Sequence, residues 1–336
     1  MKKTPRPIVI LALLAVALAA LVVVFRQRPQ HPEPGPVSGK LVVRFLDIGQ
    51  GDSELLELPT GERILIDSGD RGAPTVDLLR KYGVKQLDLI IATHPHSDHM
   101  GEMQDVMRAF KVQEFWDSGF NHPTKTYGDM LQEIKDRGIK FSTPKRGDVL
   151  KFGDVLIEVL NPSNELPDNN PNNASLVIRL TYGSKRFLFT GDAETYEGPT
   201  KPSAWQQMLE TEPDKLRADL LKAAHHGSSD GTTREVLDAV RPSIVTISCA
   251  AGNDYHHPTP RVMRMLEQAR DQVKLYRTDL EGTLTAVCDG VTIEMSSDTQ
   301  IAGERLYLTG DEVAGTVAND RREGSLKGRR NGSRAR

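Results

Sequence analysis

The stretch 93–101 reads Thr-His-Pro-His-Ser-Asp-His-Met-Gly and holds three histidines and one aspartate within six residues. An apolar run at 87–92 precedes it and a helical pattern at 102–110 follows it. We therefore expect the cluster in a loop at the carboxyl end of a buried strand. Imidazole nitrogens and carboxylate oxygens suit zinc, manganese and iron. The stretch predicts a metal site on an α/β scaffold, and a chance cluster in a loop is the alternative.

The spacing within the cluster indicates two pairs of metal ligands. His94 and His96 alternate along an extended loop, so both rings point the same way and can share one ion. Asp98 and His99 follow after the chain turns, in a position to face a second ion. Two neighbouring divalent ions polarise an oxyanion and hold a hydroxide between them. The sequence predicts one or two divalent metal ions, zinc or manganese.

Two later strand ends carry further candidate residues. Asp192 follows the apolar run 187–190, and its two oxygens can hold two cations at once, although a plain turn aspartate is the alternative. His225 and His226 follow the run 220–224, and two adjacent histidines do not both face one core. We expect His226 to bind metal and His225 to lie beside it or to act in acid–base chemistry, with the reverse assignment left open.

The pattern H-x-H-x-D-H after a strand resembles the metallo-β-lactamase fold superfamily. This resemblance implies an αββα sandwich, an α/β fold of two mixed sheets flanked by helices, with the site at one edge where strands end. It implies that Asp192 is the bridging aspartate. The sequence Asp67-Ser68-Gly69 after a strand resembles the first superfamily motif, which implies that Asp67 supports the metal-binding loop without binding metal.

The chain differs from most of the superfamily at one expected ligand. A third histidine ligand is usual near 172–175, where this sequence has Asn172-Asn173-Ala174-Ser175. An amide oxygen of Asn173 would be a harder donor than imidazole and would favour manganese or magnesium over zinc. The alternative is that Asn173 only shapes a turn.

A set of five segments, in chain order, resembles the C-terminal hydrolase domain of ComEC-type competence proteins. The segments are DIGQGD at 47–52, NNAS at 172–175, TGD at 190–192, LKAAHHGS at 221–228 and NDYHHP at 253–258. The resemblance covers residues 40–295, and asparagines at 172 and 173 are usual in this branch. It implies a link to DNA uptake, a nuclease that degrades the non-transported strand, and a place for His257 facing the active site.

Composition and the termini set the domain organisation. The net charge of −3 excludes a global basic field for nucleic acid, and the separated Cys249 and Cys288 exclude a zinc ribbon and favour buried thiols. Residues 1–26 predict a transmembrane anchor with an extracytoplasmic catalytic domain, and a cleaved signal and secretion are the alternative. A Pro-rich linker at 27–39, a hydrolase domain at 40–310 and a basic disordered tail at 311–336 follow.

Together these features predict a metal-dependent phosphodiesterase or nuclease in which a metal-bound hydroxide attacks phosphorus. Asp98 is expected to be essential for turnover, and His225 or His257 to stabilise charge or protonate the leaving oxygen. The partners would be single-stranded DNA or another phosphodiester, and a membrane through the N-terminal segment. One alternative is hydrolysis of another small ester, lactone or lactam. Another is a membrane-tethered DNA-binding or assembly factor with a vestigial site. The expected metal ligands are His94, His96, Asp98, His99, Asn173, Asp192 and His226.

Overall fold

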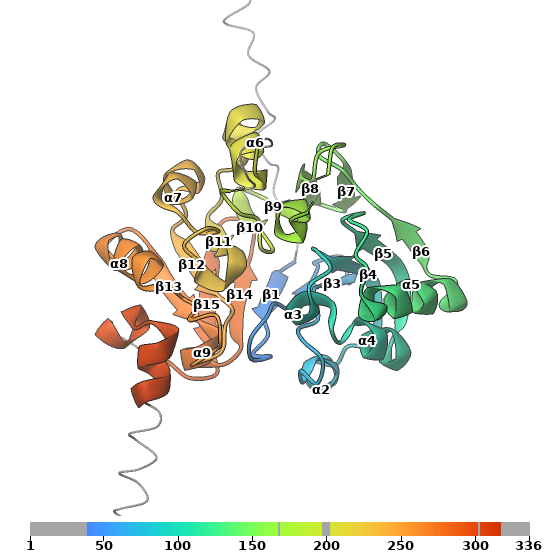
Figure 1. Cartoon of the computed structure of the whole chain (residues 1–336), viewed down its shortest axis with the longest axis horizontal. Coiled ribbons are helices and arrows are strands. Elements are labelled where there is room, and N and C mark those ends of the chain that lie inside the picture. Colours follow the sequence, from blue (N-terminus) through green and yellow to red (C-terminus); the bar gives the residue numbers. More distant parts are fainter. Residues whose placement is uncertain (1–38, 167–168, 197–201, 302, 317–336) are drawn as a thin grey trace, which may run out of the picture. The chain divides into compact units, whose positions relative to one another are not determined.

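Two β-sheets form the centre of the fold (Figure 1). The computed structural model describes residues 39–166, 169–196, 202–301 and 303–316. The first sheet has the order β15-β14-β1-β2-β3-β4-β5-β6, and the second has the order β13-β12-β11-β10-β9-β8-β7. The strands of the first sheet are β1 (Leu41–Phe45), β2 (Glu54–Glu57), β3 (Arg63–Ile66), β4 (Gln86–Ala92), β5 (Lys111–Asp117), β6 (Lys140–Ser142), β14 (Leu284–Cys288) and β15 (Ile293–Ser297). Those of the second are β7 (Val149–Phe152), β8 (Val155–Asn161), β9 (Val177–Tyr182), β10 (Lys185–Phe189), β11 (Leu220–Lys222), β12 (Ile244–Ile247) and β13 (Lys274–Arg277).

Both sheets are mixed. In the first, β3 to β6 pair in parallel and the strands from β15 to β3 pair antiparallel. In the second, β10 to β13 pair in parallel and β7 to β10 pair antiparallel. Parallel strands end at the same edge of a sheet, so residues that follow β10, β11 and β12 are brought to one edge of the second sheet, and residues that follow β3 and β4 to one edge of the first.

Three apolar layers hold the sandwich together. The middle layer joins the two sheets, and the rings of Phe45 and Phe189 stack across it with centroids 6.2 Å apart. A second layer packs helices on the outer face of the second sheet, with Trp205 fully buried at its centre. A third layer does the same on the first sheet, around Met103 and Met130. The predicted αββα sandwich is confirmed.

The helices cover the two outer faces and connect the strands. The first sheet carries α2 (Thr75–Lys81), α4 (Met103–Ala109) and α5 (Lys125–Arg137). The second carries α6 (Ala204–Thr211), α7 (Arg234–Val240) and α8 (Pro260–Gln268). Short helical turns are α3 (Ser97–Met100), α9 (Thr278–Glu281), η1 (Pro171–Ala174), η2 (Pro213–Lys215), η3 (Ala224–Gly227) and η4 (Gly303–Tyr307).

The chain stays ordered beyond the predicted end of the hydrolase domain. Residues 310–316 are helical and Val313 is fully buried, so the prediction of a disordered tail from 311 is wrong for residues 311–316. Thr309 and Glu312 form a reciprocal cap, because the Thr309 hydroxyl accepts from Glu312 N at 3.3 Å and the Glu312 carboxylate accepts from Thr309 N at 2.8 Å. This capping box starts a helix that composition alone did not indicate.

The predictions for the two ends of the chain mostly concern residues that the structure does not describe. The predicted anchor at 1–26, the linker up to residue 38 and the tail from 317 onward lie outside the described residues. Within the described ranges, no helix has the length and apolar character needed to cross a membrane. Cys249 and Cys288 are both free thiols and both buried, as expected.

Candidate metal centre

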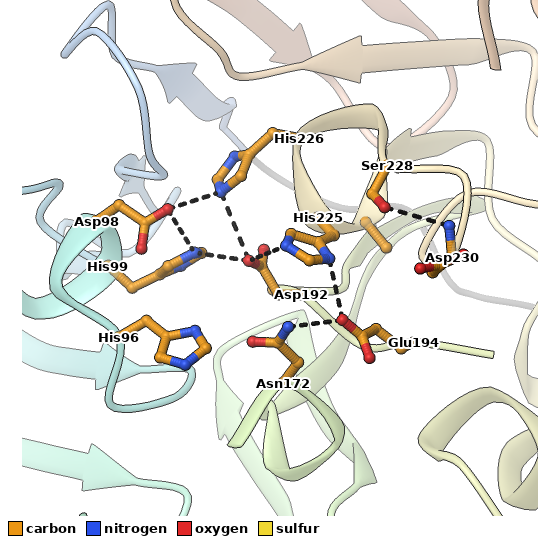
Figure 2. A network of polar contacts seen from close by, with 12 residues as sticks. His96, Asp98, His99, Asn172, Asp192, Glu194, His225, His226, Ser228 and Asp230 are labelled. Atoms are coloured by element: carbon orange, nitrogen blue, oxygen red, sulfur yellow. Dashed lines mark hydrogen bonds and ion pairs between the residues drawn. The ribbon is translucent and has the colours of Figure 1, made fainter. Parts of the chain in front are cut away.

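The candidate metal centre lies where strands of both sheets end. β4 leads directly to His94 and His96, and the short helix α3 that follows carries Asp98 and His99. β10 leads to Asp192, and β11 leads into η3 with His225 and His226. Figure 2 shows side chains from these separate segments converging on Asp192. Because each segment follows a strand packed in the core, the sheets fix the positions of these side chains.

Four donor atoms surround one point in this centre. They are Asp98 Oδ2, His99 Nε2, Asp192 Oδ2 and His226 Nε2, which all lie within 4.8 Å of one another. Asp192 Oδ2 lies 3.2 Å from His99 Nε2 and 3.6 Å from His226 Nε2, and Asp98 Oδ2 lies 3.2 Å from His226 Nε2. Ligand distances of about 2.0–2.2 Å in a tetrahedral site put donors roughly 3.3–3.6 Å apart. The four donors therefore fit a divalent ion.

A second pair of donors, from His94 and His96, lies close to Asp192. His94 Nε2 and His96 Nδ1 are 3.0 Å apart, and His94 Nε2 lies 3.9 Å from Asp192 Oδ2. Burial, followed by the charge of His99, holds the pKa of His94 well below its usual value, so this imidazole is neutral, as a metal ligand must be. The structure thus brings members of both predicted ligand pairs close to one carboxylate, and their metal binding stays a prediction.

The adjacent His225 and His226 reach the same centre through an unusual backbone. Both residues have φ 53°, in the left-handed region that non-glycine residues rarely adopt. His226 is buried, and its Nδ1 lies 2.9 Å from the Ser248 carbonyl oxygen, which leaves Nε2 for the cluster. His225 Nε2 lies 3.6 Å from Asp192 Oδ2, and its Nδ1 lies 3.2 Å from Glu194 Oε1. Backbone strain of this kind gathers at functional sites.

Asp67 supports the cluster from behind. Its carboxylate accepts hydrogen bonds from Thr93 N at 2.8 Å and from Thr93 Oγ1 at 2.7 Å, and it lies 2.8 Å from His99 Nδ1. The contact with Nδ1 turns His99 Nε2 toward Asp98 and Asp192. This geometry agrees with the supporting role that the superfamily resemblance implies for Asp67.

Sequence reasoning missed a buried ion pair beneath the centre. Lys222 and Asp52 form a salt bridge in which both side chains are 1% exposed. Asp52 also lies 3.2 Å from His226 Nδ1 and 3.8 Å from His99 Nδ1. The two residues are 170 positions apart in the chain, so local patterns gave no sign of the pair, although each lies in a segment that resembles the competence proteins.

The structure corrects the assignment of the asparagine. The Asn173 side-chain oxygen accepts backbone hydrogen bonds from Glu194 N at 3.1 Å and Ala204 N at 3.0 Å, and its nitrogen donates to the Tyr196 carbonyl. The prediction of Asn173 as a metal ligand is therefore wrong, and its side chain joins three segments of backbone. Asn172 faces the site instead. Its Nδ2 donates to Glu194 at 2.7 Å, and its buried Oδ1 has no hydrogen-bond partner among the described residues (Figure 2).

The centre is electrostatically suited to a cation. Burial raises the pKa values of Asp98 and Asp192, yet His99 and His226 hold both below the usual carboxylate value. Burial lowers the pKa of His226, but Asp192 and Asp52 outweigh it and raise this pKa to about 10. The pKa of His99 is likewise held well above its usual value by Asp192 and Asp67, against burial. A divalent ion would replace protons that the carboxylates now hold on these rings.

A pocket of about 310 Å³ opens onto the centre. It is lined by His96, Ser97, Asp98, Asp192, His225, His226, Tyr255 and His257. His257 comes from the loop after β12, and its ring centroid lies 5.2 Å from that of His225. Burial and the charge of His225 lower the pKa of His257 to about 4, so this ring is neutral at ordinary pH. The neighbouring His256 is exposed and pairs with Asp311 at 2.9 Å, away from the pocket.

Comparisons with known proteins agree with this geometry. The family model described as the metallo-beta-lactamase superfamily matches residues 46–251. ComE operon protein 3 of Bacillus subtilis is 34% identical over 263 residues, which cover 72% of this chain and 32% of that protein. Competence protein ComA of Neisseria gonorrhoeae is 27% identical over 299 residues, which cover 83% of this chain and 38% of that protein. The chain thus spans about a third of the length of these curated relatives.

A solved structure of similar fold is CmlA, a diiron β-hydroxylase from Streptomyces venezuelae. The similarity has a TM-score of 0.49 at 16% identity and covers 76% of this chain and 55% of that one. The family match covers more than half of this chain, and the two facing mixed sheets, the flanking helices and the cluster of histidines and aspartates are those of this family. The chain therefore belongs to the metallo-β-lactamase superfamily, as a metallo-hydrolase with a candidate divalent-metal centre and with competence proteins among its relatives.

Proposed function

We propose that this protein is a metal-dependent phosphodiesterase that cleaves nucleic acid, with single-stranded DNA as its first candidate substrate. The observation that carries the proposal is the position of Asp192 Oδ2, which lies 3.2 to 3.9 Å from an Nε2 atom of each of His94, His99, His225 and His226. A carboxylate oxygen surrounded in this way suits two cations rather than one. Divalent ions bound there supply positive charge that activates water and offsets charge on phosphoryl oxygens.

The residues around the pocket suit the proton transfers of such a reaction. His257 is neutral at ordinary pH, so its free ring nitrogen can accept a proton from an attacking water, and the protonated ring can then release that proton to a leaving oxygen. The Nε2 atom of His225 faces Asp192, while the contact of its Nδ1 with Glu194 fixes the ring. Imidazoles at these positions orient an anionic substrate and keep its leaving group within reach of a proton donor.

The choice of DNA rests on the relatives. The curated proteins most similar over this region include two with names that refer to the ComE operon and to competence. The resemblance to ComEC-type proteins links this branch to DNA uptake and to a nuclease role. Since this chain spans about a third of those proteins, the substrate is carried over only as a proposal.

The test uses the full-length protein, stripped of metal with a chelator and reloaded separately with Mn²⁺ and Zn²⁺. Its substrates are single-stranded DNA, double-stranded DNA and bis-p-nitrophenyl phosphate. Asp98→Ala removes a donor atom of the cluster, whereas Asp77→Ala changes an aspartate whose side chain is 83% exposed on α2 and serves as the control. We expect Asp98→Ala to lose turnover while its circular dichroism spectrum stays that of the unaltered protein.

The outcomes separate the alternatives. Cleavage of DNA that disappears in Asp98→Ala and persists in Asp77→Ala supports the proposal. Cleavage of the small diester alone would keep the chemistry and exclude DNA as the substrate. Metal bound without turnover on any of the three substrates would overturn the phosphodiesterase assignment and favour an ester, lactone or lactam. Failure to bind metal at all would favour a vestigial site.

A further inference from the structure

An exposed aromatic ring lies on the wall of an otherwise polar pocket. Tyr255 is 61% exposed, and the other side chains that line the pocket are histidines, aspartates and a serine. Tyr196 is similarly exposed, at 66%, but does not line the pocket. Tyr255 thus supplies the large apolar surface that a bound molecule would meet beside the metal centre.

The backbone that carries Tyr255 is fixed from the inside. The buried side chain of Asn253 accepts hydrogen bonds from Tyr255 N at 3.2 Å and His257 N at 3.1 Å, and it donates to Ala250 O at 2.8 Å. The loop is therefore held at both ends while the ring itself remains open to solvent. A ring carried on a fixed backbone loses less conformational entropy when another flat group stacks on it than a ring on a mobile loop would.

The ring of Tyr255 also lies near the histidines of the candidate metal centre. The rings of Tyr255 and His257 are nearly parallel, at 26° with centroids 6.0 Å apart, and His257 in turn lies 5.2 Å from the ring of His225. His225 Nε2 lies 3.6 Å from Asp192. Two side chains therefore separate Tyr255 from Asp192. Tyr255 and Asp192 nevertheless line the same pocket, so a base stacked on the ring and a phosphate near Asp192 would occupy one cavity.

We propose that Tyr255 is the platform on which the nucleobase next to the cleaved phosphodiester stacks. The inference rests on the proposed phosphodiesterase function and deepens it, because it identifies the substrate as a base-bearing nucleic acid. Every nucleobase has a π face, so stacking on a tyrosine tolerates any sequence. The hydroxyl of Tyr255 is not needed for this role, whereas the aromatic ring is.

The binding experiment uses a probe that the enzyme does not hydrolyse. A short single-stranded oligonucleotide with methylphosphonate linkages and one 2-aminopurine is titrated into the full-length protein, and stacking is read as quenching of its fluorescence. Tyr255→Ala should raise Kd roughly 5- to 150-fold, which corresponds to about 1–3 kcal/mol for one stacked base. Tyr255→Phe should bind as the unaltered protein does, and so should the control Tyr196→Ala.

A kinetic comparison separates stacking from other contacts. With metal bound, Tyr255→Ala should lower kcat/KM for a base-bearing oligonucleotide by a similar factor and leave that for an abasic oligonucleotide unchanged. Tyr255→Leu keeps apolar volume without an aromatic face and should resemble Tyr255→Ala. Equal Kd values for Tyr255→Ala and the unaltered protein would overturn the inference even if DNA is cleaved. If Tyr255→Phe bound as weakly as Tyr255→Ala, the effect would belong to the hydroxyl, and this result would overturn the inference too.

The failure of the underlying function has a different signature. If the unaltered protein cleaves neither abasic nor base-bearing phosphodiesters, the phosphodiesterase proposal fails. Fluorescence quenching that depends on the Tyr255 ring would in that case still support a base-binding surface, because the methylphosphonate probe requires no turnover.

Discussion

The substitution Asp67→Asn tests whether a buried carboxylate sets the orientation of a metal-binding histidine. The Asp67 side chain is fully buried and contacts Thr93 N, Thr93 Oγ1 and His99 Nδ1 at 2.7 to 2.8 Å. An asparagine has nearly the same shape but only one accepting oxygen. If its oxygen stays on Thr93 N, its amide group donates toward His99 Nδ1.

This change in the hydrogen bond at His99 Nδ1 determines how much metal affinity is lost. When Nδ1 of His99 must accept a hydrogen bond, the proton of the neutral ring moves to Nε2, the atom that lies 3.2 Å from Asp192 Oδ2 in the ligand cluster. A protonated Nε2 cannot bind a metal ion. Changing the partner that orients a metal-binding histidine costs roughly 10- to 100-fold in metal affinity. In the variant the Thr93 hydroxyl loses its acceptor on residue 67. An unsatisfied buried donor lowers the unfolding free energy by about 1–3 kcal/mol.

The assay is competition between the protein and a chromophoric chelator for Zn²⁺, with Asp77→Asn as a matched exposed control. The nitrogen chemical shifts of the His99 ring report its tautomer directly. We expect a higher Kd for zinc, a proton on Nε2 of His99 in the metal-free variant at high pH, and an unaltered circular dichroism spectrum. A variant that folds and binds zinc with the original Kd would refute the claim that Asp67 orients His99.

Two more predictions concern charge in the interior. The pKa of His226 is raised to about 10 by Asp192 and Asp52 despite burial, and that of His99 is also raised, so both rings hold a proton in the metal-free folded state that an unfolded histidine releases near pH 6.5. The metal-free protein should therefore lose stability as the pH rises from about 6.5 to 10, which urea denaturation measures. Metal affinity should rise over the same range, which calorimetry in buffers of different ionisation enthalpy measures. A stability that rises through this range would contradict the assignment. Lys222→Met leaves Asp52 buried without its cation and should lower the unfolding free energy by about 3–5 kcal/mol. The double variant Lys222→Met, Asp52→Asn should regain part of that loss in the same denaturation experiment.

Local patterns in the sequence, together with the resemblance to the metallo-β-lactamase superfamily, predicted the fold and the strand ends that carry the candidate site. The apolar strands have period-two or continuous patterns, and the polar residues directly follow them, as at Ala92 before the histidine cluster and Phe189 before Asp192. Strand ends in an α/β sandwich meet at one edge, so the motif order predicted which segments would converge. That part of the prediction depends on backbone topology alone.

The direction of individual side chains could not be predicted in the same way. Asn172 and Asn173 are adjacent in a turn, and the choice of which faces the site depends on backbone amides of Glu194 and Ala204, 21 and 31 residues away from Asn173. The left-handed backbone at His225 and His226 likewise depends on tertiary packing, because isolated histidines avoid it. Distant partners decide such positions, and a single sequence does not identify them.

The charges of the centre favour two divalent ions over one. Asp52, Asp67, Asp98 and Asp192 contribute four carboxylates, and burial together with Asp52 raises the pKa of the adjacent Glu54 well above its usual value, so Glu54 is not counted with them. When His99 and His226 have lost their protons to bind metal, the ammonium of Lys222 is the cation paired with these four carboxylates, which leaves three net negative charges among these residues. One dication would leave the centre negative and repel an anionic phosphodiester, since buried charges are weakly screened. Two dications would make it singly positive and match a monoanionic diester. We therefore expect native mass spectrometry to find two ions per chain, and a single ion at saturation would mean that protons on the histidines supply the missing charge.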